Sequence, residues 1–109
     1  MNIRKHLPLA PRDLLILAVL AEGPLHGYGI IKAVEARSRS GVLLDPANLY
    51  RVLRRMGGLG WIRPTEGGGS RRRTYEVTPA GREVLRAELT RLESLLAHAR
   101  PALAGGDRR

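Results

Sequence analysis

The chain has 109 residues, no cysteine and a formal net charge of +9, and seventeen of its 19 basic residues are arginine. This length suits one small domain and leaves no room for an elaborate active site, while the lack of cysteine excludes disulfides and thiolate metal sites. Arginine-rich domains of this kind most often bind nucleic acid, although an acidic lipid surface or simple solubility would also explain the charge.

No segment has the pattern of a signal peptide or a membrane span. The longest apolar run, Leu14 to Ala21, is about a third of what a bilayer crossing requires, so we expect a cytoplasmic protein with no membrane partner. The first nine residues carry Arg4, Lys5 and His6 without clear periodicity. They are interpreted as a basic arm that either touches a DNA backbone or frays.

Two helices are predicted next. Pro11 to Ala21 is apolar over most of its circumference and should be central to the core, and Glu22-Gly23-Pro24 should end it. A second helix is expected from about His26 to Arg37, with Tyr28 among its inward residues. A loop follows, and Val42-Leu43-Leu44 is expected to form a short strand.

Residues 45–56 are predicted to form a capped helix. Asp45 can accept hydrogen bonds from the free backbone N–H groups of a first helical turn, and Pro46 suits the first helical position. Leu49, Val52, Leu53 and Met56 recur at helical spacing and should be buried. Gly57 and Gly58 are expected to supply the left-handed residue that ends the helix.

The outer face of this helix is cationic and can form hydrogen bonds. It carries Asn48, Tyr50, Arg51, Arg54 and Arg55, and no acid follows Asp45 within the helix to neutralise the arginines. Such a helix suits a DNA major groove. The alternative is an amphipathic helix whose charges only maintain solubility.

Two extended runs, Trp61 to Glu66 and Thr74 to Val77, flank a glycine-rich segment and predict a β-hairpin. Its tip, residues 67–73, contains the consecutive arginines Arg71, Arg72 and Arg73. Three arginines beside flexible glycines favour contact with phosphates, and the alternative is an exposed loop kept soluble by charge.

Thr78-Pro79 starts the last predicted helix, which runs to about Arg100 before Pro101. Alternating steps of four and three residues place apolar side chains along one seam, namely Leu85, Leu89, Leu92, Leu96 and Ala99. We assign this seam to self-association, the alternative being that the helix docks on its own core. Residues 101–109 are predicted to be a disordered tail.

Several motifs in this order closely resemble the PadR-like transcriptional regulators. They are L-A-E-G-P-L-H-G-Y-G-I at 20–30, N-L-Y-R-V-L-R-R-M at 48–56, G-W-I at 60–62, R-R-R-T-Y at 71–75 and T-P-A-G-R-E at 78–83. The resemblance covers about Leu7 to Ala99. It implies a mainly α fold with a small β-hairpin, in which residues 1–78 form a winged helix-turn-helix and 79–100 a single dimerisation helix.

The resemblance also implies site residues. It places Asn48, Tyr50, Arg51 and Arg54 on the DNA-facing side of the recognition helix and Arg71 to Arg73 in the wing. Many relatives have proline where this chain has Arg51. Some relatives bind flat aromatic drugs between aromatic side chains at the dimer centre, but the helix 80–100 contains no aromatic residue. A stacked-drug site is therefore not expected.

The sequence thus predicts a homodimeric repressor that binds an inverted-repeat operator in double-stranded DNA through helix 45–56 and the wing 67–73. An effector of unidentified chemistry is kept among the expected partners. The alternative is a winged-helix module that binds protein and does not read DNA. An enzyme, a cofactor and a metal are not expected, because His6, His26 and His98 are far apart in the sequence and no nucleophile motif occurs.

Overall fold

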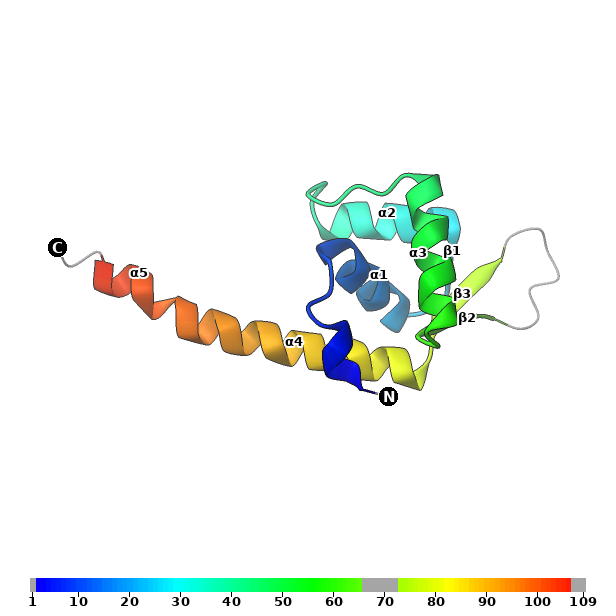
Figure 1. The fold of residues 1–109 in the computed structure, drawn as a ribbon. Coiled ribbons are helices and arrows are strands. Elements are labelled where there is room, and N and C mark those ends of the chain that lie inside the picture. The colour runs from blue at the N-terminus through cyan, green and yellow to red at the C-terminus, as the bar shows by residue number, and fades with distance from the viewer. Residues whose placement is uncertain (1, 66–72, 107–109) are drawn as a thin grey trace.

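The computed structural model describes residues 2–65 and 73–106, which form a mainly helical fold with a three-stranded antiparallel sheet (Figure 1). The predicted fold class is therefore confirmed. In chain order the elements are η1 (Ile3–His6), α1 (Pro11–Ala21), β1 (Leu25–His26), α2 (Gly27–Arg37), α3 (Pro46–Gly58), β2 (Ile62–Pro64), β3 (Thr74–Val77), α4 (Pro79–Ala99) and α5 (Pro101–Gly106).

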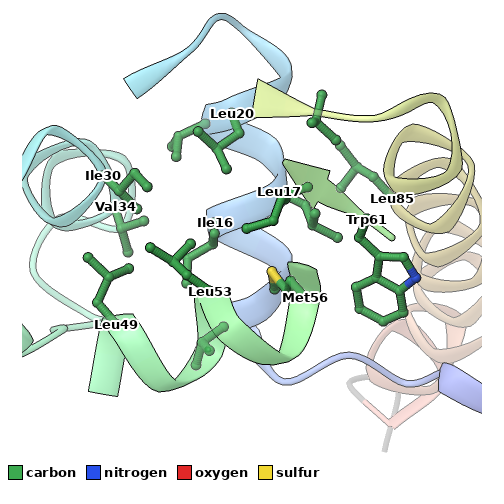
Figure 2. Packing of buried hydrophobic residues seen from close by; sticks show 14 of the residues in the cluster. Ile16, Leu17, Leu20, Ile30, Val34, Leu49, Leu53, Met56, Trp61 and Leu85 are labelled. Atoms are coloured by element: carbon green, nitrogen blue, oxygen red, sulfur yellow. The ribbon is translucent and has the colours of Figure 1, made fainter. Parts of the chain in front are cut away.

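Helix α1 forms the centre of the core, as its composition predicts. It contacts α2, α4 and β3, and Ile16, Leu17 and Leu20 lie between the surrounding elements (Figure 2). Ile30 on α2 and Trp61 before β2 complete the hydrophobic cluster from opposite sides. Burying such side chains contributes about 1.5–3 kcal/mol each, so this cluster holds the helices together.

Helices α2 and α3 begin at capping side chains. His26 Nδ1 accepts a hydrogen bond from the Gly29 backbone N–H at 3.1 Å, and Asp45 Oδ1 accepts one from the Asn48 N–H at 2.8 Å. These bonds satisfy donors that a helix start leaves free. The capping role predicted for Asp45 is confirmed, and His26 caps α2 where the second helix was expected to begin.

The prediction of a strand at residues 42–44 is wrong. The Ser38 hydroxyl bonds with Val42 instead, accepting from its N–H at 3.0 Å and lying 3.3 Å from its carbonyl oxygen. The loop therefore closes on itself and its backbone is not available to the sheet. The first strand is β1, which pairs with β3 through Leu25 opposite Tyr75.

The end of α3 also differs from the prediction. The helix continues through Gly57 and Gly58, and Gly60, with φ of +81°, is the left-handed residue. The Gly60 N–H donates to Gly57 O at 3.1 Å and the Trp61 N–H to Met56 O at 2.9 Å, the two bonds of a Schellman motif. Gly57 and Gly58 lie within the helix, so the presence of glycine alone could not locate the cap.

The start of α4 is fastened to the base of the hairpin. Thr78 Oγ1 accepts from the Gly81 N–H at 3.0 Å and donates to Gly60 O at 2.6 Å, while the Thr78 N–H donates to Trp61 O at 2.9 Å. A Cβ on Gly81 would lie 2.1 Å from Trp61 O. The T-P-A-G motif therefore caps α4 and lets it approach the chain at Trp61.

Helix α4 extends away from the domain on the side opposite the hairpin, and α5 continues beyond it (Figure 1). The molecule is therefore elongated, with a longest extent of 63 Å. The predicted disordered tail is corrected for its first part, because Pro101–Gly106 are helical and residues 107–109 lie outside the described residues. No helix in the described part of the chain is long and apolar enough to span a bilayer.

Candidate nucleic-acid interface

Helix α3 separates an apolar face from a cationic one. The buried residues of the helix are Leu49, Val52, Leu53 and Met56, as predicted. Tyr50, Arg51 and Arg54 are exposed on the other side. Within residues 2–65 and 73–106, neither Arg51 nor Arg54 makes an ion pair, so both guanidinium groups can bind an anion.

Asn48 is only partly available to a ligand. Its side-chain amide donates to Asp45 Oδ2 at 2.9 Å, while its backbone N–H donates to the other carboxylate oxygen. This arrangement uses one of the two amide N–H groups. The amide oxygen and the second N–H remain for pairing, and they lie at the start of the helix.

Arg55 belongs to a different environment from the other predicted contact residues. Its Nη2 lies 2.5 Å from Oδ2 of Asp13 on α1, and the Asp13 side chain is only 7% exposed. The expectation that no acid neutralises the arginines of α3 is therefore wrong for Arg55. The acid comes from another helix, which a search within α3 could not find.

A hollow of about 300 Å³ lies between α3 and the hairpin. Residues of α3, β2, β3 and the hairpin line it, namely Tyr50, Leu53, Arg54, Gly57, Ile62, Arg63, Pro64, Arg73 and Tyr75. Two tyrosine side chains and three arginines thus meet at one concave surface. The sequence did not single out Arg63 or Tyr75, because only the folded hairpin brings them beside α3.

The hairpin carries charge of both signs. Arg63 Nε donates to Glu76 Oε2 at 2.8 Å across the β2–β3 pair. Arg73 is exposed immediately before β3. The other two predicted wing residues, Arg71 and Arg72, lie outside the described residues.

Helix α2 adds two surface residues near the start of the helix-turn-helix. Tyr28, predicted to face inward, is 66% exposed, and Lys32 Nζ lies 5.9 Å from the centre of its ring. Val34, which was predicted to face inward, is buried, and Ile30 is buried in place of Tyr28. The 3.6-residue period left Tyr28 at the edge of the apolar face, where periodicity does not decide burial.

The predicted seam of α4 divides into two parts. Leu85 is buried in the domain core, whereas Leu89 and Leu96 are 45% and 51% exposed. Leu92 is half-buried, and Ala99 is exposed. Leu95, which was not predicted, is 51% exposed as well. The apolar surface without a partner in the described chain therefore begins after Leu85.

No group of three or more histidine, aspartate or glutamate side chains that could hold a metal occurs in the part of the chain that the structure describes.

Two capped helices, α2 and α3, followed by a β-hairpin beside α3, define a winged helix-turn-helix protein. A model of the transcriptional regulator PadR-like family matches residues 16–87, which is more than half of the chain. The chain belongs to this family.

The chain is also similar to part of a curated protein. A 37.1 kDa protein encoded in transposon Tn4556 of Streptomyces fradiae is 46% identical over 76 residues, which are 70% of this chain. The chain spans about a fifth (21%) of the length of that curated relative.

Solved structures agree in fold. A transcriptional regulator from Clostridium thermocellum superposes with a TM-score of 0.72 at 25% identity, covering 91% of each chain. PadR of Bacillus subtilis, solved in complex with operator DNA, superposes with a TM-score of 0.60 at 25% identity, over 71% of this chain and 45% of that one.

Proposed function

We propose that this protein is a DNA-binding transcriptional regulator that acts as a homodimeric repressor at an inverted-repeat operator. The observation that carries the proposal is the exposed cationic face of α3, a capped helix whose opposite face is buried in the core. The operator complex of the Bacillus subtilis relative supports DNA as the partner.

In the proposed complex, α3 enters the major groove and the hairpin reaches the adjacent backbone. Arg51 and Arg54 lie on the outward face, where a guanidinium can pair with guanine edges at about 1–3 kcal/mol of discrimination per good pair. Tyr50 and Arg73 border the hollow beside the hairpin and suit phosphate oxygens. Asn48 keeps one amide N–H and its oxygen for an adenine edge.

The exposed part of α4 supports self-association. The side chains of Leu89, Leu95 and Leu96 are about half exposed in the described part of the chain. Beside them, Ile3, Leu7 and Pro8 of the N-terminal segment line a second hollow of about 700 Å³ against α4. A second copy of α4 would bury both surfaces, and a two-fold axis would then set two α3 helices about one helical turn of DNA apart.

Selection of bound duplexes from a random pool, followed by gel shifts at moderate salt, tests the proposal. We expect the wild-type protein to select an inverted repeat. The Arg51→Ala variant should have an altered base preference at one position of each half-site. Arg37→Ala is the matched control, because Arg37 pairs with Glu22 and its removal lowers the net charge equally away from α3. Recovery of no specific sequence would favour a module that binds protein.

Repression is tested by transcription in vitro from a promoter that contains the selected site. We expect added protein to reduce the transcript, and Arg51→Ala to require a higher concentration for the same reduction. An increase in transcript would instead identify an activator.

A further inference from the structure

Asp13 is a buried carboxylate that the proposed DNA contacts do not use. It lies in the first turn of α1 and is 5% exposed. Its two oxygens have different partners. Oδ2 accepts from Nη2 of Arg55 at 2.5 Å, and Oδ1 accepts from Nε of Arg12 at 3.4 Å. The bond to Arg55 joins residues 42 positions apart in the sequence.

The guanidinium group of Arg55 lies at the edge of α3, whereas those of Arg51 and Arg54 are on its outward face. Successive residues of a helix are 100° apart, which places Arg55 toward the edge of α3 on which Asn48 also lies. Asp13 holds the guanidinium at this edge, although the Arg55 side chain is 46% exposed and could reach water. Two of the three arginines of α3 are therefore presented outward without an acidic partner in the described chain.

The ion pair between Asp13 and Arg55 should stay formed when the protein binds DNA. If Arg55 turned to a phosphate, Asp13 would be left buried with only the longer contact to Arg12. Removing one partner of a buried carboxylate is destabilising, because it leaves an uncompensated charge. One phosphate contact by a mobile surface arginine contributes less than this loss at physiological salt.

We infer that Asp13 is a specificity-determining positioning residue, which withholds Arg55 from the DNA backbone and so limits binding to non-operator sequence. The inference rests on the proposed function. Phosphate contacts increase affinity for every sequence equally, whereas base contacts distinguish the operator. Neutralising one arginine of α3 therefore lowers non-specific affinity without removing a base contact.

The salt dependence of DNA binding tests this inference. Binding of the full chain to its operator and to a scrambled duplex is measured by fluorescence anisotropy between about 0.05 and 0.3 M salt. Each phosphate contact makes the slope of log K against log salt more negative by about 0.9. We expect Asp13→Asn to steepen the slope on the scrambled duplex by about 0.9 for each α3 bound. The affinity for scrambled DNA should rise on the order of fivefold per helix at 0.15 M salt.

The double variant Asp13→Asn/Arg55→Gln identifies the cation responsible. We expect it to return the slope to the wild-type value, and Arg55→Gln alone to leave the slope unchanged. Arg12→Gln is the control for removing the other cation beside Asp13. A purely structural role for Asp13 would weaken binding to both duplexes and would not change the slope.

Two outcomes would overturn the inference. One is an unchanged slope for a folded Asp13→Asn protein, and the other is a slope reduced by about 0.9 per helix for Arg55→Gln. Thermal unfolding followed by circular dichroism shows whether each variant is folded. If Asp13→Asn does not fold, Arg55→Gln alone decides, because the side chain of Arg55 is half exposed and the amide of glutamine can still donate a hydrogen bond to the Asp13 carboxylate. Failure of the proposed function would appear differently, as a wild-type protein that does not prefer its operator.

Discussion

The hydroxyl oxygen of Tyr50 lies against the backbone of Gly27, so that a Cβ atom on residue 27 would fall 2.7 Å from it. This contact brings an exposed aromatic side chain of α3 over the first turn of α2. It gives a physical reason for the first glycine of the H-G-Y-G motif, because any side chain there would compete with Tyr50 for the same space.

Gly27→Ala should weaken DNA binding more than it changes stability. Tyr50 is 49% exposed and can swing away from the added methyl group, and alanine is favoured over glycine in a helix. The free energy of unfolding should therefore change by less than about 1 kcal/mol. Urea unfolding and operator affinity measure the two effects separately.

Gly29→Ala is the matched control for Gly27→Ala. The nearest atom to its new Cβ would be a leucine methyl carbon at 3.4 Å, an ordinary contact. Equal losses of affinity in the two variants would show that the position of Tyr50 is not the cause.

Gly81→Ala should destabilise the domain strongly. The added Cβ would meet the Trp61 carbonyl oxygen at 2.1 Å, and a backbone atom cannot move aside as a side chain does. Over-packing of this kind typically costs about 1–3 kcal/mol and sometimes more. Gly58→Ala, with nothing within 4 Å of its Cβ, should instead raise the free energy of unfolding by up to about 1 kcal/mol. Urea denaturation of both variants checks the contrast.

Glu88 should make stability depend on pH in the acid range. It is 1% exposed on α4, and hydrogen bonds from Arg91 lower its pKa against the opposing effect of burial, with help from the Leu9 backbone N–H. A carboxyl group whose folded-state pKa is depressed stabilises the protein above its unfolded-state pKa, near 4.3. This stabilisation is lost as the pH falls through the folded-state pKa.

The comparison of wild type with Glu88→Gln measures this effect. Wild type should have the higher free energy of unfolding at pH 7, and the difference should shrink toward zero in strong acid. Glu93→Gln is the control for removing a carboxylate from the exposed surface of the same helix. A difference between wild type and Glu88→Gln that did not vary with pH would contradict the assigned role of the carboxylate.

Leu85→Ala and Leu96→Ala should separate folding from association. Leu85 belongs to the domain core, so its truncation should cost about 2–5 kcal/mol of unfolding free energy. Leu96 is half exposed, and its truncation should mainly weaken the dimer. Sedimentation velocity over a range of concentrations measures the second effect. Leu96→Ala with an unchanged dimer population would place the interface elsewhere.

Local signals in the sequence predicted most of the helices. Proline after a capping residue located the starts of α3 and α4, and the four-residue apolar stripe of α3 identified its buried side. These features depend on residues within one helical turn of each other, so a single chain displays them directly. The cap at Thr78 and the strand at Thr74–Val77 were predicted for the same reason.

Features that depend on tertiary contact could not be predicted. Asp13 on α1 and Arg55 on α3 are in contact, and nothing in the sequence of either helix identifies the other residue as its partner. The two-residue strand β1 is defined only by its pairing with β3. The sequence instead predicted the first strand at Val42-Leu43-Leu44, which is a longer apolar run. Gly60 was missed because the choice among three nearby glycines depends on where Trp61 packs.

The order of the strands connects the two ends of the proposed DNA-binding elements. β3 lies between β1 and β2, and these two strands directly precede α2 and follow α3 (Figure 1). The sheet therefore fastens the beginning of the helix-turn-helix and its end to the same strand. In the proposed dimer, α3 and the hairpin of each subunit would therefore move together as one rigid unit. A change in the spacing between half-sites would then require α4 to bend beyond the core.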